Sequence, residues 1–376
     1  MLTKLDVAWG LLVNYTTNMR YYLFKSNSGS KPKVIFDLKD RRVEPYYFLM
    51  IYSFHEAGFH VVLRHDFMFI ANIRKSGHFL FKLPNLTIRF NVSKDINPED
   101  IIITDKEGWY SKNKAQKNIH ISFDVYSSKP KHQFFTTIPF FMSPDQYIYG
   151  YFRAIKTLRN SEKKMKVFFS GNQNKTSYDN SIFQDFFNLM SRIEVLDTLK
   201  NTLTPNEILI IDEKSKWTLM EDSFQNKFVL NQWSWSHDDS ENLDARVPNE
   251  KWLNVLSESH FFLATPGIRM PLCFNVTEAM SVGTIPIIQY PHYYNPPLQD
   301  MVNCIVFKNQ EDLMIKMRFV LTLNNVIINV LKNNVTDYYD KHLQLHCLPN
   351  RIRKINNEKV TLLINAEQVS YLAHLE

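Results

Sequence analysis

The stretch SESHFFLATPGIRMPLCFNVTEAMSVGTIPIIQYP, from Ser257 to Pro291, decides the fold. It predicts a buried strand at 260–264, then a Pro-Gly turn and a loop, then a short helix from Thr277 and a second buried strand at 285–289. Gly283 ends the predicted helix, because glycine readily adopts the backbone that closes a helix. This order of strand, loop, helix N-terminus and strand is how α/β proteins build sites for anions and nucleotides.

Three residues of this stretch are candidates for ligand binding. Glu278 falls in the first predicted turn of the helix, where the helix dipole favours a carboxylate that can hold ribose hydroxyls. Stabilising the dipole is the alternative role for this side chain. Thr277 is predicted to cap the helix, and its backbone N–H can also face phosphate. Gly267 is either a plain turn residue or the point where the backbone approaches a ligand.

Composition and charge restrict the class of protein. The chain has 376 residues, of which 44% are hydrophobic and 22% charged, as in a soluble globular protein with two full cores. Its net charge of +6 is scattered, whereas nucleic-acid-binding proteins concentrate cations on one face, so no nucleic-acid partner is expected. Cys273, Cys304 and Cys347 show neither metal spacing nor a disulfide framework, which favours a reducing, cytoplasmic location.

The N-terminal segment is amphipathic and aromatic. Polar residues interrupt its apolar positions between residues 5 and 24, and no apolar run of the chain reaches the ~20 residues of a membrane helix. We therefore predict a packing helix here. Peripheral contact with the inner face of a membrane is left open.

Short apolar strands alternate with helices along both halves of the chain. Strands at 33–37 and 59–63 flank a helix at 45–57, which is the start of an open parallel sheet. A charged run at 159–166 precedes a new strand at 167–170. We predict an α/β fold with two facing Rossmann-like domains and a ligand cleft between them. The predicted parts are an N-terminal domain at 1–155, a second domain at 156–345 and a packing segment at 346–376.

Further candidates for phosphate binding lie in the second half. Gly171 and Asn172 follow its first strand, although a strand-ending Gly-Asn turn is also common without a ligand. Cations can neutralise a diphosphate, and Arg269 is the best placed of them; any single cation is more often a surface charge. The candidate cations are Arg269, Arg246, Arg192 and Lys216.

Two aromatic runs are less specific. Trp233, Trp235 and His237 lie in NQWSWSHDD, where the Trp rings can stack on a base or sugar or can belong to a half-buried strand. The run at 292–294 follows the last strand of the opening stretch and is expected at the cleft. No Asp-x-Asp follows a strand, so no metal is expected.

The residues of the second half resemble a known class of enzyme. VFFSGN at 167–172, SHFFLATPG at 259–267 and NVTEAMSVGTIPII at 275–288 resemble the donor-binding half of GT-B glycosyltransferases, above all the exostosin-like family. That family places an arginine at the position of Asn275, so Arg269 is the alternative phosphate contact from the loop. VTE and GTIPI also resemble the α1,3-fucosyltransferases, which have lysine at the position of Ala279.

The resemblance implies transfer of a sugar from a nucleoside diphosphate to a hydroxyl of a glycan or lipid-linked glycan, with inversion and without metal or other cofactor. Helix N-termini and cations then neutralise the leaving diphosphate. An inverting reaction needs a general base on the acceptor side. Two alternatives stay open: a fucosyltransferase-like enzyme using GDP-fucose, and a non-catalytic module that binds glycans or nucleotides. The candidate bases, all at predicted strand ends or turns, are Asp37, His65, Asp66 and Asp145.

Overall fold

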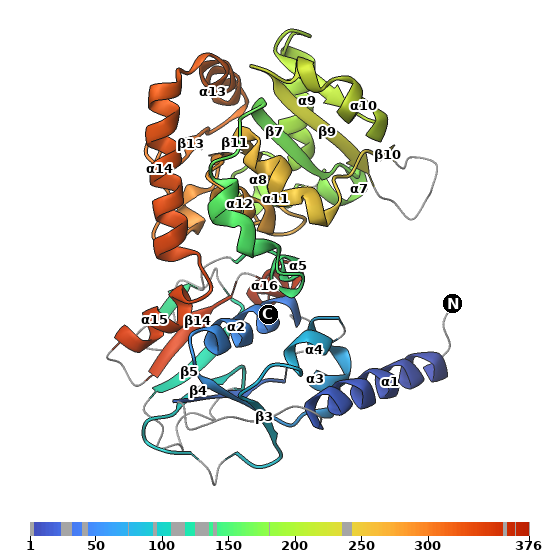
Figure 1. Cartoon of the computed structure of the whole chain (residues 1–376), viewed down its shortest axis with the longest axis vertical. Coiled ribbons are helices and arrows are strands. Elements are labelled where there is room, and N and C mark those ends of the chain that lie inside the picture. The colour runs from blue at the N-terminus through green and yellow to red at the C-terminus, as the bar shows by residue number, and fades with distance from the viewer. Residues whose placement is uncertain are drawn as a thin grey trace. The chain divides into compact units, whose positions relative to one another are not determined.

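The computed structural model divides the chain into two compact α/β units. Unit 1 comprises Met1–Pro139 and Gln344–Glu376, and unit 2 comprises Phe140–Leu343. Each contains a largely parallel sheet with helices, so the prediction of two Rossmann-like domains is confirmed (Figure 1). The structure describes residues 4–23, 32–39, 44–73, 75–92, 96–106, 117–124, 135–137, 141–179, 181–234, 243–355, 359–364 and 366–375.

Unit 1 is built on a parallel sheet of seven strands. They are β1 (Lys33–Asp37), β2 (His60–Arg64), β3 (Leu86–Arg89), β4 (Ile101–Thr104), β5 (Lys117–Ser122), β6 (Phe135–Thr137) and β14 (Lys359–Leu363). Their order is β3-β2-β1-β4-β5-β14-β6. All four residues of β4, IIIT, are buried, as expected for a central parallel strand covered on both faces.

The helices of unit 1 pack around this sheet. They are α1 (Lys4–Leu23), α2 (Glu44–Glu56), α3 (Phe67–Asn72), α4 (Lys75–Leu80), α15 (Cys347–Lys354) and α16 (Gln368–Leu375). On α2, Phe54 meets Phe36 of β1 edge to face, with ring centroids 5.8 Å apart. The carboxylate of Asp66 accepts a hydrogen bond of 2.8 Å from the backbone N–H of Phe69, so Asp66 caps α3.

Unit 2 also has seven strands. They are β7 (Met165–Asn172), β8 (Ile208–Ile211), β9 (Phe228–Ser234), β10 (Leu243–Asp244), β11 (Ser259–Ala264), β12 (Ile285–Ile288) and β13 (Ile305–Val306). The main path is β10-β9-β7-β11-β12-β13, with β8 also paired to β9, and only β10 runs antiparallel. The chain adds strands on one side of β7 and then, from β11 on, on the other, so β7 and β11 form the switch point of the sheet.

Helices cover both faces of the second sheet. Successive residues of a strand point to opposite faces, so Phe168 and Gly171, three residues apart on β7, mark the two faces. Phe168 contacts Trp217 and Trp252, whereas Gly171 lies against Arg192. The helices are α5 (Pro144–Ile148), η2 (Tyr151–Ala154), α6 (Ile155–Leu158), α7 (Lys175–Tyr178), α8 (Ile182–Phe187), α9 (Arg192–Thr202), α10 (Lys214–Leu219), η3 (Glu221–Ser223), α11 (Asn249–Ser257), α12 (Phe274–Ser281), η5 (Pro291–Tyr293), α13 (Gln310–Thr322) and α14 (Asn325–His342).

The two units differ from the predicted domains in two places. The first boundary lies at 139/140 instead of 155/156, because the segment between these positions packs within unit 2: the backbone N–H of Ser143 donates to Glu278, and the carboxylate of Asp145 accepts from Asn249. The C-terminal residues are not a separate packing segment. They supply β14, which lies between β5 and β6 in unit 1.

One predicted helix has other limits in the structure. α12 begins at Phe274, so Thr277 is not its cap and Glu278 is not in its first turn. Left-handed residues separate other helices of unit 2. Asn188, with φ of 52°, ends α8 before the capping box of α9, and Gly150, with φ of 75°, lies between α5 and η2.

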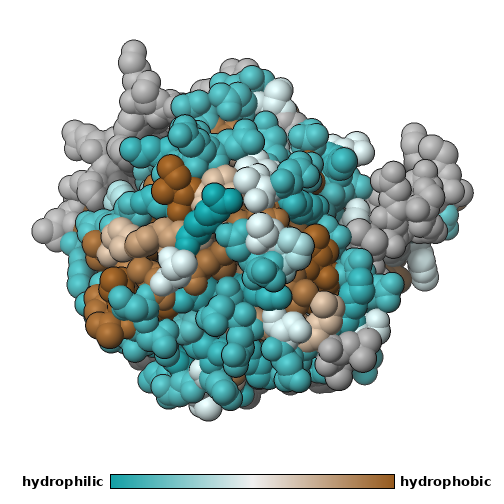
Figure 2. Space-filling model, turned by 90° about the horizontal axis from the view of Figure 1, so that it is seen from above, coloured by the Kyte–Doolittle hydropathy of each residue, from teal (hydrophilic) through white to brown (hydrophobic). Residues whose placement is uncertain are grey.

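Apolar side chains stay exposed where α13 meets α14. Ile315 and Phe319 on α13 and Val326 and Val330 on α14 are 38–75% exposed. Hydrophobic groups interrupt the hydrophilic surface on the face seen from above (Figure 2). Within the described residues, no single helix is long and apolar enough to cross a membrane; α13 and α14 meet that criterion only as a pair, bent by 110°.

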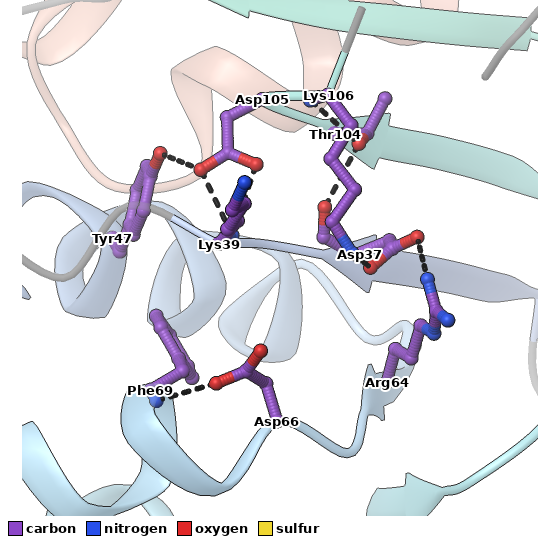
Figure 3. A network of polar contacts seen from close by, with 9 residues as sticks. All are labelled: Asp37, Lys39, Tyr47, Arg64, Asp66, Phe69, Thr104, Asp105 and Lys106. Carbon is purple, nitrogen blue, oxygen red and sulfur yellow. Dashed lines mark hydrogen bonds and ion pairs between the residues drawn. The ribbon is translucent and has the colours of Figure 1, made fainter.

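A buried carboxylate joins the strand ends of unit 1. Asp37 is 1% exposed and ends β1, where Arg64 of β2 donates a hydrogen bond of 2.8 Å to one oxygen and Lys106 contacts the other (Figure 3). The hydroxyl of Thr104 donates to the backbone carbonyl of Asp37 at 2.8 Å. Asp37 therefore neutralises two cations at the carboxyl edge of the sheet.

Replacing Asp37 with alanine is expected to lower the free energy of unfolding of unit 1 by roughly 3 kcal/mol, because two cations lose their buried partner. Urea denaturation measures this. The matched control in unit 1 is Glu56→Ala, which removes an exposed partner of His55 and should cost less than about 0.5 kcal/mol. Equal losses in the two variants would contradict the structural role of Asp37.

Candidate functional site

A cavity of about 300 Å³ lies in unit 2 at the carboxyl ends of its parallel strands. β7 and β9 contribute their last residues, and α9 and α12 contribute their first turns, so the cavity lies beside the switch point of the sheet. The lining residues are Ser143, Asp145, Gln146, Ser170, Gly171, Asn172, Tyr178, Arg192, Trp233, Arg246, Val247, Asn249, Trp252, Cys273, Phe274, Asn275 and Glu278.

Arg192 brings a buried positive charge to this cavity. The side chain is at the first position of α9, and the residue is 4% exposed. Its guanidinium donates to the carbonyl of Pro266 at 2.9 and 3.1 Å and to that of Asn172 at 2.9 Å, and it lies 3.8 Å from the ring centre of Tyr178. No carboxylate of the described chain contacts it. A buried cation without a counter-charge favours an anionic ligand.

Two further features add positive potential at the same wall. Arg246 lines the cavity with its guanidinium 5.8 Å from the ring centre of Trp233. The first turn of α12 borders the cavity, and its N-cap residue, Cys273, makes no capping hydrogen bond through its side chain. An uncapped helix N-terminus leaves backbone N–H groups for an anion.

The backbone at Gly171 passes close to Arg192. A Cβ at this position would lie 3.0 Å from the ring of Phe169 and 3.3 Å from Nη1 of Arg192. Glycine therefore allows the end of β7 to approach the guanidinium closely.

Glu278 is the buried acid of the cavity. It is 3% exposed; one carboxylate oxygen accepts the backbone N–H of Ser143 at 3.0 Å, and the other accepts the indole N–H of Trp252 at 2.7 Å. Burial raises the pKa of Glu278 to about 7; the hydrogen bonds from Ser143 and Trp252 oppose this rise, and the charge of Asp145 adds to it. The side chain thus ties α12 to α11 and to the start of α5.

The cavity gathers only part of the predicted donor site. Gly171, Asn172, Arg246, Asn275 and Glu278 all line it. The other three predicted donor residues lie outside its lining: Thr277 is fully buried inside α12, Gly267 forms a turn in which its N–H donates to the carbonyl of Met270, and Arg269 is half-buried.

The candidate bases fall in different units. Asp145 lines the cavity of unit 2 and accepts a hydrogen bond of 2.9 Å from the side chain of Asn249. Asp37 and His65 belong to unit 1. Asp37 is held by two cations, and His65 shares a 2.9 Å hydrogen bond with the hydroxyl of Tyr15 and stacks on Phe90.

The remaining candidates have other surroundings. Lys216 pairs with Asp212 on the surface of α10. The run at 292–294 does not line the cavity, whereas Trp233 does. Trp235, His237 and the two aspartates after it lie outside the described residues.

Some residues of the cavity were not predicted from the sequence, and the importance of another was not recognised. Ser143, Gln146 and Trp252 were not considered, because their roles depend on contacts between segments far apart in the chain. Arg192 was considered only as one cation among several; its position directly after the Ser191 cap was the available signal. Over the described ranges, no three His, Cys, Asp or Glu side chains form a cluster suited to a metal ion.

No family model matches the sequence, and no curated protein matches it. Among solved structures, HepE of Anabaena in complex with UDP aligns with a TM-score of 0.42 and 11% identity over 86% of this chain and 99% of HepE. WaaG, a glycosyltransferase involved in lipopolysaccharide biosynthesis, aligns with a TM-score of 0.35 and 13% identity over 85% of this chain and 98% of WaaG.

A mutant of S. aureus TarM, solved with fondaparinux, α-GlcNAc-glycerol and UDP, gives a TM-score of 0.34 and 11% identity over 69% of this chain. The chain spans 56% of the length of that TarM chain. Likenesses at these TM-scores carry no conclusion about ligand or reaction.

Glu278 predicts a pH dependence of stability. Its pKa is higher in the folded protein, about 7, than the ordinary 4.5, so the folded state binds the proton more tightly. Its contribution to stability therefore falls as pH rises from about 4.5 to about 7 and is constant above that. Glu278→Gln should remove this slope. As pH rises through this range, the wild type should lose on the order of 3 kcal/mol of unfolding free energy relative to the variant.

Urea denaturation at several pH values measures the slope. In the Glu278→Gln variant, the amide N–H meets the N–H of Ser143 or Trp252. This contact lowers the unfolding free energy by an amount that does not depend on pH. Glu250→Gln, at an exposed position of α11, is the control and should leave the slope of the wild type. Parallel profiles for wild type and Glu278→Gln would refute the assignment.

Proposed function

We propose that the protein is a GT-B glycosyltransferase, which moves a sugar from a nucleoside diphosphate sugar to a hydroxyl of a glycan or lipid-linked glycan. The observation that carries the proposal is the buried guanidinium of Arg192, which has no carboxylate partner within the described chain and lies on a cavity at the switch point of unit 2. A diphosphate is the anion that such a place in an α/β sheet commonly binds.

The other walls of the cavity suit the rest of a nucleotide sugar. Trp233 and Trp252 offer aromatic surface for a base or sugar ring. Glu278 lies one α-helical turn beyond Asn275, and its oxygens, although each accepts one hydrogen bond, retain further lone pairs for ribose hydroxyls. Unit 1, which contains its own Rossmann-like sheet, is proposed to bind the acceptor.

The proposed reaction is a displacement with inversion and without metal. The acceptor oxygen forms a bond to the anomeric carbon while the bond from that carbon to the diphosphate oxygen breaks. The electron pair leaves with the diphosphate, whose charge Arg192, Arg246 and the first turn of α12 stabilise. A general base takes the hydroxyl proton of the acceptor. Asp145 is the candidate base that lines the cavity, and Asp37 and His65 are its alternatives in unit 1.

Nucleotide binding tests the proposal. One nucleoside diphosphate, offered as UDP or GDP, should raise the melting temperature through its affinity for the folded state. Its sugar derivative should be hydrolysed slowly in the presence of a chelator. Failure of both nucleotides to bind would refute the function. Preference for GDP would favour the fucosyltransferase-like alternative. Binding without transfer, together with unchanged binding in Glu278→Gln, would favour the non-catalytic module.

Arg246→Ala should weaken binding of the nucleoside diphosphate by about tenfold, because one charge-assisted contact to phosphate is lost. The affinity should also become less sensitive to salt. Isothermal titration at two salt concentrations measures both effects. Arg318→Ala is the matched control, since Arg318 is 56% exposed, pairs with Glu207 and does not line the cavity. The same loss in both variants would exclude a direct contact by Arg246.

A further inference from the structure

Gln146 carries a buried side-chain amide. It lies on α5, is 3% exposed and lines the cavity of unit 2. Its side-chain oxygen is sealed from solvent and has no hydrogen-bond partner among the described residues. Its backbone N–H donates to the carbonyl of Ser143, so the residue is fixed beside the Ser143–Glu278 contact.

Asn275 repeats the pattern on the facing element. It lies in the first turn of α12 and lines the same cavity, and its side-chain oxygen is buried without a partner in the described chain. Glu278 is three residues further on, and residues at this spacing share one face of a helix. Two unpaired amides thus flank the buried carboxylate, one on α5 and one on α12.

Unpaired buried amides are costly, and native proteins keep few of them. Both residues line a cavity that a ligand can enter, and rotation of each side chain would turn its amide toward that ligand and supply the missing partner. Because the two amides are neutral, they suit uncharged groups of a ligand, whereas the cations Arg192 and Arg246 suit phosphate. A hydroxyl group both donates and accepts, so it satisfies an amide whichever of its two atoms faces the cavity.

We propose that Gln146 and Asn275 select the ligand by hydrogen bonding to hydroxyl groups of a sugar ring. This inference rests on the proposed function, which supplies two such rings: the ribose of the nucleotide and the sugar that is transferred. A site built to pair with a hydroxyl strongly rejects the analogue that lacks it, because its polar groups then stay unpaired. The two amides therefore determine specificity, and the cations provide the attraction to diphosphate.

The test compares Gln146→Met and Asn275→Leu, which keep the size of each side chain and remove its polar atoms. Calorimetry measures binding of UDP and GDP, of their 2′- and 3′-deoxy forms, and of the matching nucleotide sugars. If the amides read ribose, the wild type should prefer the ribonucleotide by about tenfold or more, and the variants should lose that preference. If they read the transferred sugar, the variants should bind the diphosphate normally and lose the extra affinity of the nucleotide sugar.

Stability gives an independent readout. Gln146→Met removes an unpaired polar group, so the melting temperature without ligand should stay the same or rise while ligand selection is lost. Gln146→Asn keeps the amide but shortens its reach, and it should lose selection as well. Gln184→Met changes an exposed amide on α8 and should alter neither property.

Unchanged selection in both Gln146→Met and Asn275→Leu would overturn the inference and leave the proposed function intact. A lower melting temperature with unchanged selection would give the amides a structural role and overturn it too. If the wild type binds neither UDP nor GDP, the proposed function fails first, and this inference fails with it.

Discussion

A single buried guanidinium fixes the geometry of the carboxyl edge of unit 2. Arg192 holds the backbone carbonyls at the end of β7 and after β11, the two strands from which the sheet grows in opposite directions. Backbone carbonyls and the ring of Tyr178 orient the charge but do not neutralise it. The same contacts that shape the cavity therefore leave this charge without a counter-charge, which is the reason for proposing a diphosphate at this place.

Glu278 is a buried acid that lines the same cavity as the buried cation Arg192. Its carboxylate is held by donors from α5 and α11, so three segments separated along the chain meet at one side chain. Burial raises the pKa of this acid even though it receives two hydrogen bonds. Acid and cation stay unpaired with each other because each is already bound to the backbone or to neutral donors. That separation keeps open the space in which a ligand can lie.

Local sequence patterns were enough to predict the two Rossmann-like sheets, since runs such as IIIT and FFLA show parallel strands directly. They also predicted that Gly171, Asn172 and Glu278 belong to one site, and all three line the same cavity. Other features depend on contacts between residues far apart in the sequence. They are the partners of Glu278, the burial of Arg192 and the pairing of β14 with β5 and β6 of unit 1. The start of α12 was misplaced because Cys273 is an unusual helix cap, and no local signal marks it.

The position of β14 has a consequence for synthesis on the ribosome. Residues 359–363 lie between β5 and β6, although all of unit 2 separates them from these strands in the sequence. Unit 2 is continuous in sequence, so it can fold as soon as it emerges. The sheet of unit 1 must wait for a strand that is translated later, and its edges at β5 and β6 remain unpaired in the meantime. The nascent chain is therefore most open to wrong strand pairing in the half that is made first.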